Sequence, residues 1–435
     1  MTLAEVKLWD DRVGAVELAN GDDIATFQYE PAFVARGFDV SPLTMPRREA
    51  PFSFPGLARG SFDGLPGLLA DSLPDRYGHA LINAWLARQG RTPSSFDSVE
   101  RLCYIGRRGI GALEFEPAFG PDPSADEAIN VAELADLAAE ILARREALSE
   151  TLATPRQEHA LEQILRVGTS AGGARAKAVV ALNPETEEVR SGQLDLGPGF
   201  EHWILKFDGV EDESRELGEG RGYGTIEWVY SELARRAGIE MAECRLLSEG
   251  GRSHFMTRRF DRRDDGSKVH MQSLAAMLHL DFNQAGAHSY EQAFDAIRRL
   301  GLPRHDVEQQ FRRMVFNVVA RNQDDHVKNI AFLMDSDGAW RLSPAFDATY
   351  AYNPSGRWTS LHQMTINGKR DDHTLADFAA VGDLASMKRG EAKRIAGEVI
   401  EAVSAWPELG SEAGIGDARV AEIKSTLRLD LADRS

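Results

Sequence analysis

The first 120 residues contain short runs in which apolar positions alternate with polar ones. Residues 6–9, 14–18 and 25–29 have the alternating or apolar pattern that is typical of β-strands, and Asp-Asp or Gly-Asp pairs separate them. A helical pattern follows from about Asp75 and places apolar side chains on a single face: Leu81, Ile82, Trp85 and Leu86. This part of the chain therefore predicts a β-rich subdomain with one embedded helix.

The pattern changes after residue 120. The acidic, proline-containing segment 120–126 is typical of a linker. Asn130 and Glu133 then form a capping pair for a predicted helix that carries Leu134, Leu137 and Ile141. A domain boundary is expected between residues 120 and 155.

A second group of elements follows from about residue 165. Residues 167–174 form a loop of small residues, and a predicted strand through Lys177 comes next. A second strand is predicted at 203–207, with Lys206 in it, and a helix from 225 to about 237. Loop, strand, strand with a lysine, and helix is the order of a kinase-like small lobe.

Helical patterns dominate after about residue 270. Apolar residues keep helical spacing from Val307 to Val319 and lead directly to Asp324. The whole pattern predicts an α+β fold, namely a protein-kinase-like two-lobed fold with an added N-terminal β-rich subdomain and a mostly helical C-terminal lobe. The predicted divisions are an N-terminal subdomain at 1–120, a linker and helix at 121–155, a small lobe at 156–268 and a helical lobe at 269–435.

The composition is ordinary for a globular chain. Of 435 residues, 43% are hydrophobic and 27% are charged, and the formal net charge is -18. Because phosphate repels a surplus of carboxylates, this charge argues against non-specific nucleic-acid binding by the chain alone. The two cysteines fit a reducing compartment, and we see neither a signal peptide nor an apolar run of membrane-spanning length. We therefore expect a cytoplasmic protein with no membrane partner.

The most specific chemical pattern surrounds a predicted hairpin at 330–342. Asp324 and Asn329 lie five positions apart just before the hairpin, and Asp347 follows it. Protein kinases use such an Asp and Asn, and then a metal-binding Asp, to place a base beside the acceptor hydroxyl and to hold magnesium on ATP. A second Asp-Asp-His triplet begins at Asp371, but it lacks both the later Asn and the returning Asp. The full arrangement predicts phosphoryl transfer, with Asp324 as the base and with Asn329 and Asp347 as magnesium ligands.

Other assignments remain open in this segment. Asp325 competes with Asp324 for the role of base, although the spacing to Asn329 favours Asp324. His326 could bind a metal or brace the loop, and the structural alternative for the whole triplet is a solvated turn. A metal-dependent hydrolase is a further alternative, but cysteine ligands and a helical histidine pair are absent nearby in the sequence.

Three more features fit a nucleotide site. The backbone amides of residues 168–174 could cradle phosphates, although glycine-rich loops are often plain turns. Lys206 lies on an apolar strand and must direct its ammonium group to a polar partner, which is either ATP phosphate or an acidic neighbour. Glu227 could orient Lys206 as in protein kinases, or it could only favour the helix dipole.

Five ordered motifs are distributed over nearly the whole chain. They are 109–115 (G-I-G-A-L-E-F), 170–177 (S-A-G-G-A-R-A-K), 259–262 (R-F-D-R), 324–329 with 344–347, and 364–369 (M-T-I-N-G-K). Together they resemble the HipA family of bacterial toxin kinases, the kinase half of a type II toxin–antitoxin pair. Arg258 departs from the family pattern, which commonly has Glu there, and residues 270–274 keep only part of the usual H-Q-E-D pattern.

The resemblance implies an ATP- and magnesium-dependent Ser/Thr protein kinase. It places Lys206 at the nucleotide and Phe260 near adenine, and it makes a phosphate loop of Ser170, Ala171, Gly172, Gly173 and Ala174. Ser170 matches the family's autophosphorylated serine, and Thr169 is an adjacent rival. Phosphorylation there would eject the loop and silence the kinase, because a dianion repels the phosphates of ATP.

The resemblance also implies partners. They are a HipB-like helix-turn-helix antitoxin, operator DNA reached mainly through that antitoxin, and a protein substrate of the aminoacyl-tRNA synthetase type, typically glutamyl-tRNA synthetase, whose modification arrests translation and leads to persistence. Two other functions remain open: a catalytically idle corepressor of an antitoxin–DNA complex, and a small-molecule kinase. Retention of Lys206, Asp324, Asn329 and Asp347 argues against the idle corepressor, while the Ser170 loop and the N-terminal subdomain favour a protein acceptor.

Overall fold

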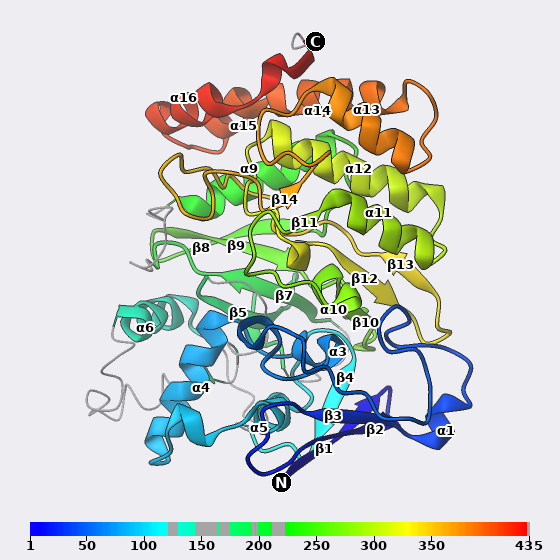
Figure 1. Cartoon of the computed structure of the whole chain (residues 1–435). Coiled ribbons are helices and arrows are strands. Elements are labelled where there is room, and N and C mark those ends of the chain that lie inside the picture. The colour runs from blue at the N-terminus through cyan, green and yellow to red at the C-terminus, as the bar shows by residue number, and fades with distance from the viewer. Residues whose placement is uncertain are drawn as a thin grey trace.

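The computed structural model describes residues 1–120, 129–143, 164, 165, 167, 175–193, 196, 199–210 and 222–432. These residues form an α+β fold in which the N-terminal strands and the C-terminal helices lie at opposite ends, with a second sheet between them (Figure 1). Most of the predicted linker and all of residues 168–174 lie outside the described residues.

The N-terminal subdomain is built on a four-stranded sheet in the order β3-β2-β1-β4. Its elements are β1 (Thr2–Leu8), β2 (Asp11–Leu18), β3 (Thr26–Tyr29), α1 (Pro31–Val34), α2 (Arg59–Phe62), α3 (Gly67–Ala70), α4 (Arg76–Arg88), η1 (Pro93–Ser95), α5 (Ser98–Ile105) and β4 (Leu113–Glu116). Ala4, Val6 and Leu8 of β1 point into the core, as strand alternation requires. The strands and the embedded helix α4 predicted from the sequence are confirmed.

The second sheet has five antiparallel strands in the order β6-β5-β7-β9-β8. Its strands and helices are α6 (Val131–Ala143), β5 (Lys177–Leu182), β6 (Val189–Ser191), β7 (Glu201–Lys206), α9 (Tyr223–Arg236), β8 (Cys244–Glu249) and β9 (Arg252–Arg258). Asn130 caps α6 by accepting a 3.1 Å hydrogen bond from the Glu133 amide. Helix α9 contacts β8 and β9, and its apolar stripe lies in the core that it shares with the C-terminal helices. The predicted order of strand, strand with lysine, and helix is confirmed.

Helices form most of the C-terminal part. The elements are β10 (His270–Ser273), α10 (Leu274–Leu278), β11 (His288–Ser289), α11 (Tyr290–Arg299), α12 (Arg304–Val319), η2 (Val327–Asn329), β12 (Ala331–Met334), β13 (Trp340–Leu342), β14 (Met364–Thr365), α13 (Leu375–Leu384), α14 (Glu391–Ser404), α15 (Trp406–Glu412), α16 (Asp417–Thr426) and η3 (Leu429–Ala432). Helices α9, α12 and α14 share one large apolar core. The hairpin β12–β13 lies where the sequence predicts it.

A buried group of residues, which we name the joint, ties the N-terminal subdomain to the rest of the chain: Gly109, Gly111, Arg259, Asp261 and Arg262. Asp261 accepts hydrogen bonds from Arg259 at 2.7 Å, from Arg262 at 2.9 Å and from the Gly111 amide at 2.7 Å. Both arginines also donate to the carbonyl oxygen of Gly109, at 3.2 and 3.0 Å. Gly111 has a φ of +78°, a left-handed conformation that glycine adopts without strain. Two motifs that are 150 residues apart therefore form one contact.

The segment that keeps only part of the H-Q-E-D pattern also contacts the N-terminal subdomain. Gln272 donates a 3.0 Å hydrogen bond to the Ser41 hydroxyl. Ser273 donates to Asp71 from its amide at 2.6 Å and from its hydroxyl at 2.8 Å. These contacts place the segment on the border between the two parts of the molecule.

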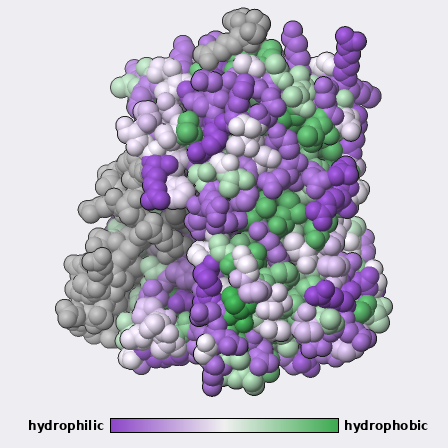
Figure 2. All heavy atoms as spheres, in the orientation of Figure 1, coloured by the Kyte–Doolittle hydropathy of each residue, from purple (hydrophilic) through white to green (hydrophobic). Residues whose placement is uncertain are grey.

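The face shown in Figure 2 is mainly hydrophilic, with hydrophobic residues in separate patches between charged and polar ones. Among the helices that the structure describes, none is both long and apolar enough to cross a bilayer.

Candidate active site

The loop after α12 carries the predicted base. Helix α12 ends at Val319, and Arg321 turns the chain with a φ of +58°. The side chain of Asp324 keeps 44% of its surface exposed, and Oδ1 lies 4.0 Å from Nε2 of His326. Asn329 holds the loop closed, because its amide nitrogen donates a 2.9 Å hydrogen bond to the carbonyl oxygen of Asp324. The loop therefore presents a carboxylate at an accessible position.

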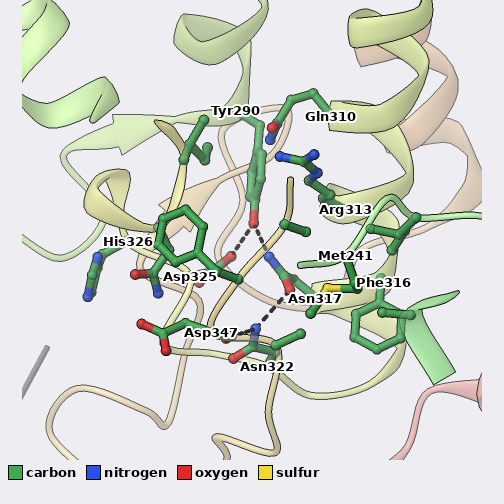
Figure 3. Close-up of a pocket in the computed structure, with 17 residues that line it drawn as sticks. Met241, Tyr290, Gln310, Arg313, Phe316, Asn317, Asn322, Asp325, His326 and Asp347 are labelled. Atoms are coloured by element: carbon green, nitrogen blue, oxygen red, sulfur yellow. Dashed lines mark hydrogen bonds between the residues drawn. The ribbon is translucent and has the colours of Figure 1, made fainter. Parts of the chain in front are cut away.

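Asp325, the rival for the role of base, faces the opposite way, into the protein. Its side chain is completely buried, and it accepts a 2.8 Å hydrogen bond from the Tyr290 hydroxyl (Figure 3). It also accepts hydrogen bonds from Nδ1 of His362 at 2.9 Å and from the Gln363 amide at 2.8 Å. A carboxylate with three protein donors is well suited to fix a loop. The geometry thus divides the two neighbouring carboxylates between an exposed position and a bracing position.

A chain of hydrogen bonds leads from Asp325 toward Asp347 (Figure 3). Asn317 donates to the Tyr290 hydroxyl at 2.9 Å and accepts from Asn322 at 2.9 Å, and Asn322 also donates to the Asp347 carbonyl oxygen at 3.3 Å. Asp347 itself has a φ of +54°, an uncommon conformation for a residue with a side chain. The loop that carries Asp324 and Asp325 and the segment after the hairpin are therefore fixed relative to each other.

Lys206 occupies the centre of the candidate site. Its ammonium group lies 2.5 Å from Oε1 of Glu227 and also contacts Oδ1 of Asp347. Glu227 uses its second oxygen to bind Arg175 at 3.0 Å. Sequence reasoning left Glu227 between two roles, and the structure pairs it with Lys206.

The charges in this cluster shift one another's ionisation. Burial raises the pKa of Asp347, but the adjacent Lys206 ammonium group outweighs burial and lowers the pKa to about 2. Burial lowers the pKa of Lys206, and the carboxylates of Asp347 and Glu227 reverse the effect, so that the pKa lies above its ordinary value. Both Lys206 and Asp347 are therefore charged at neutral pH.

Asp347 and Asn329 fit the magnesium site that the sequence predicts. Asp347 offers a carboxylate with 29% of its surface exposed. The amide nitrogen of Asn329 donates to Asp324, so the amide oxygen is the atom of this side chain that could bind a metal. Magnesium prefers oxygen ligands and commonly takes one or two from the protein and the rest from phosphates and water. Within the described ranges, no group of three or more His, Cys, Asp or Glu residues could hold a metal.

Two other predictions concern the nucleotide itself. The Phe260 ring lies 5.6 Å from that of Phe346, which directly precedes Asp347, so Phe260 borders the candidate site. Thr169, Ser170, Ala171, Gly172, Gly173 and Ala174 lie outside the described residues.

Sequence reasoning missed the contacts of Arg175, Lys177 and Asp75. Lys177 is almost fully buried and forms a 2.8 Å ion pair with Asp75. A signal for Lys177 was present, because a lysine in the apolar strand K-A-V-V-A-L must find a polar partner just as Lys206 must. Asp75 gave no such signal, since its partner lies 102 positions away in the chain.

The five-stranded sheet with a lysine paired to a helix glutamate, together with a helical lobe that carries the Asp-Asn loop, defines a protein-kinase-like α+β fold. The family follows from comparison with known sequences. The HipA-like C-terminal domain matches residues 169–406, and the HipA N-terminal domain matches residues 4–116. The chain belongs to the HipA family, as its motifs predict.

The chain is also similar to a solved structure and to a curated protein. Its fold is similar to a chain of the Shewanella oneidensis HipA, HipB and operator DNA complex, with a TM-score of 0.67 and 18% identity over 99% of this chain and 97% of that one. It is also 28% identical over 207 residues to a Sinorhizobium fredii protein named "Putative kinase Y4mE". That match covers 43% of this chain and 48% of the relative, so the chain spans about half the length of the curated relative.

Proposed function

We propose that this protein is an ATP- and magnesium-dependent Ser/Thr protein kinase that serves as the toxin of a toxin–antitoxin pair. The observation that carries the proposal is the convergence of Lys206, Glu227 and Asp347 beside the loop of Asp324 and Asn329. Phosphoryl transfer requires mainly positioning and charge neutralisation, and this cluster supplies a fixed cation, two oxygen ligands and an accessible carboxylate.

Each residue has a distinct part in the proposed reaction. Lys206, held by Glu227, binds the phosphates of ATP, and Phe260 borders the adenine. Magnesium, when held by Asp347 and Asn329, would neutralise the charge of the phosphates. Asp324 accepts the proton of the acceptor hydroxyl while that oxygen bonds to the γ-phosphorus, the bond to the bridging oxygen breaks and ADP leaves.

The acceptor and the partners are proposed from the family. The acceptor is a serine of a translation-related protein of the aminoacyl-tRNA synthetase type, with glutamyl-tRNA synthetase as the first candidate. A HipB-like antitoxin binds the chain and connects it to operator DNA. The similar Shewanella chain comes from a complex with HipB and operator DNA, and the net charge of -18 favours indirect contact with DNA.

Ser170 is the proposed site of self-silencing, with Thr169 as the alternative. A phosphate on this loop would repel the phosphates of ATP. The test is the time course of labelled phosphate transfer from ATP by Ser170→Ala and by the wild type. Activity that lasts longer in Ser170→Ala supports this assignment, whereas unchanged self-silencing points to Thr169.

Transfer of the labelled γ-phosphate of ATP to proteins in a cell lysate tests the main proposal. We expect Asp324→Asn to reduce labelling by about 10²- to 10⁴-fold, the usual contribution of a general base. Asp372→Asn, at an exposed residue of the second Asp-Asp-His triplet, is the control and should label like the wild type. Absence of labelling by the wild type would favour the idle corepressor, and full labelling by Asp324→Asn would remove Asp324 from the mechanism.

A further inference from the structure

A buried ion pair joins the N-terminal subdomain to the edge of the candidate nucleotide site. Asp75 precedes α4, and its Oδ1 accepts a 2.7 Å hydrogen bond from the Gly78 amide at the start of that helix. Its Oδ2 lies 2.8 Å from the ammonium group of Lys177, the first residue of β5. Only 9% of the Asp75 side chain and 2% of the Lys177 side chain are exposed. The carboxylate is thus fixed by its own helix and directed at one lysine.

Lys177 lies on the same face of the sheet as Lys206. The two residues are directly opposite each other on the antiparallel strands β5 and β7, and opposite residues project to the same side. Lys177 is also close enough to the charges of Asp347 and Lys206 to be affected by both. It therefore borders the cluster that we assign to the phosphates of ATP.

The pair is interdependent. Burial raises the pKa of the Asp75 carboxyl and lowers the pKa of Lys177, and the charge of each partner opposes the shift in the other. Removing one member of a buried pair leaves the other charge without compensation, which is strongly unfavourable. The Asp75 carboxylate of the N-terminal subdomain thus offsets part of the cost of burying the Lys177 ammonium group.

We propose that Asp75 is a positioning residue for nucleotide binding: it holds Lys177 in the place from which this lysine binds the phosphates of ATP. The inference rests on the proposed kinase function. An ammonium group has three N–H donors, so Lys177 can keep its bond to Asp75 and still donate to phosphate. The N-terminal subdomain then contributes to the nucleotide site through Asp75.

A double-mutant cycle tests the role of Asp75. The dissociation constant of a non-hydrolysable ATP analogue with magnesium is measured for the wild type, Asp75→Asn, Lys177→Gln and the double variant. We expect Asp75→Asn to weaken binding on the order of tenfold, within the usual range for coupling between sites, and to add nothing in the Lys177→Gln background. The same variant should raise KM for ATP and leave kcat at saturating ATP unchanged.

Asp71→Asn is the matched control. Asp71 lies in the same subdomain and accepts hydrogen bonds from Ser273 of the C-terminal part. Asp71→Asn therefore measures how much the loss of any contact between the two parts weakens ATP binding. Its ATP affinity should equal that of the wild type. Should Asp75→Asn bind like the wild type, or should the effects of the two substitutions simply add, the proposal is wrong.

Two further outcomes remain decisive. Where Asp75→Asn does not fold, Lys177→Gln is compared with the double variant, which removes both buried charges: equal affinities support the proposal and unequal ones overturn it. Where Lys177→Gln binds too weakly to measure, the comparison of Asp75→Asn with Asp71→Asn decides. If the wild type does not bind the analogue, the proposed function itself is wrong. If the wild type and Asp75→Asn bind it equally well, only the role of Asp75 is wrong.

Discussion

The joint and the candidate active site both place an aspartate against basic side chains, yet they differ in what surrounds the charges. In the joint, the Asp261 side chain is 3% exposed and is held by two arginines and a backbone amide. In the candidate active site, Asp347 keeps 29% of its surface exposed beside Lys206, and Asp324 keeps 44%. The joint is closed by protein groups, whereas the candidate site leaves charge accessible to a ligand.

This difference separates two kinds of motif that look alike in a sequence. R-F-D-R and D-D-H-V-K-N are both dense in charge, and both resemble family patterns. A closed network contributes to structure because its charges are satisfied within the protein. An open cluster favours binding and chemistry because a substrate can reach its charged groups.

Asp347→Ala, in the candidate active site, is the substitution with the largest expected effect. The substitution removes a carboxylate that would hold magnesium, whose stabilisation of charge amounts to several kcal/mol, so phosphoryl transfer should fall about 10³-fold or more. The rate of transfer at saturating magnesium measures it. Asp337→Asn, in the turn of the β12–β13 hairpin, is the control and should retain full activity; full activity of Asp347→Ala would refute the metal assignment.

Most of the fold was predictable because its signals are local. Alternation in β1 to β3, the lysine-bearing strand β7 and the stripe of α9 each follow from neighbouring residues. The Asp324–Asn329 spacing was also local, and a hairpin made the position of Asp347 predictable. The division between Asp324 and Asp325 was only suggested, because burial of Asp325 depends on Tyr290 and His362, which are 35 and 37 positions away.

The joint could not be predicted because its contacts join residues that are far apart in the sequence. The G-I-G-A-L and R-F-D-R motifs were visible as separate patterns, but their contact depends on how two distant segments fold together. Neither motif contains a sequence pattern that predicts contact with the other. Long-range ion pairs such as Asp75 with Lys177 belong to the same class.

Asp261→Asn, in the joint, should lower the stability of the protein. Loss of this carboxylate leaves two buried guanidinium groups without their partner, which should lower the free energy of unfolding by about 3–5 kcal/mol. Denaturation by urea measures the change. Asp264→Asn, at a side chain that is 89% exposed, should have little effect. A catalytic loss in Asp261→Asn without any loss of stability would break the distinction between the two regions.

The pH dependence of stability sharpens this test. Burial raises the pKa of Asp261, but Arg259 and Arg262 outweigh it and hold the pKa well below the ordinary value. A carboxyl whose pKa is lower in the folded state stabilises the protein above the pKa of the unfolded chain, about 3.9, and this stabilisation is lost as the pH falls. The unfolding free energy of the wild type should therefore decline below about pH 4, and the decline should be shallower in Asp261→Asn.

Trp9→Phe gives the smallest expected effect and probes the border of the N-terminal subdomain beside the joint. The Trp9 indole donates a 2.7 Å hydrogen bond to the Lys268 carbonyl oxygen, and phenylalanine cannot replace it. The loss should cost about 1 kcal/mol, visible as a lower urea midpoint, while the rate of transfer per folded molecule stays unchanged. Trp358→Phe, at a residue that is 36% exposed, serves as the control for replacing a tryptophan by phenylalanine. Because the Trp9 hydrogen bond to Lys268 lies on the border between the subdomains, a fall in the transfer rate at full stability would mean that this border also sets the geometry of catalysis.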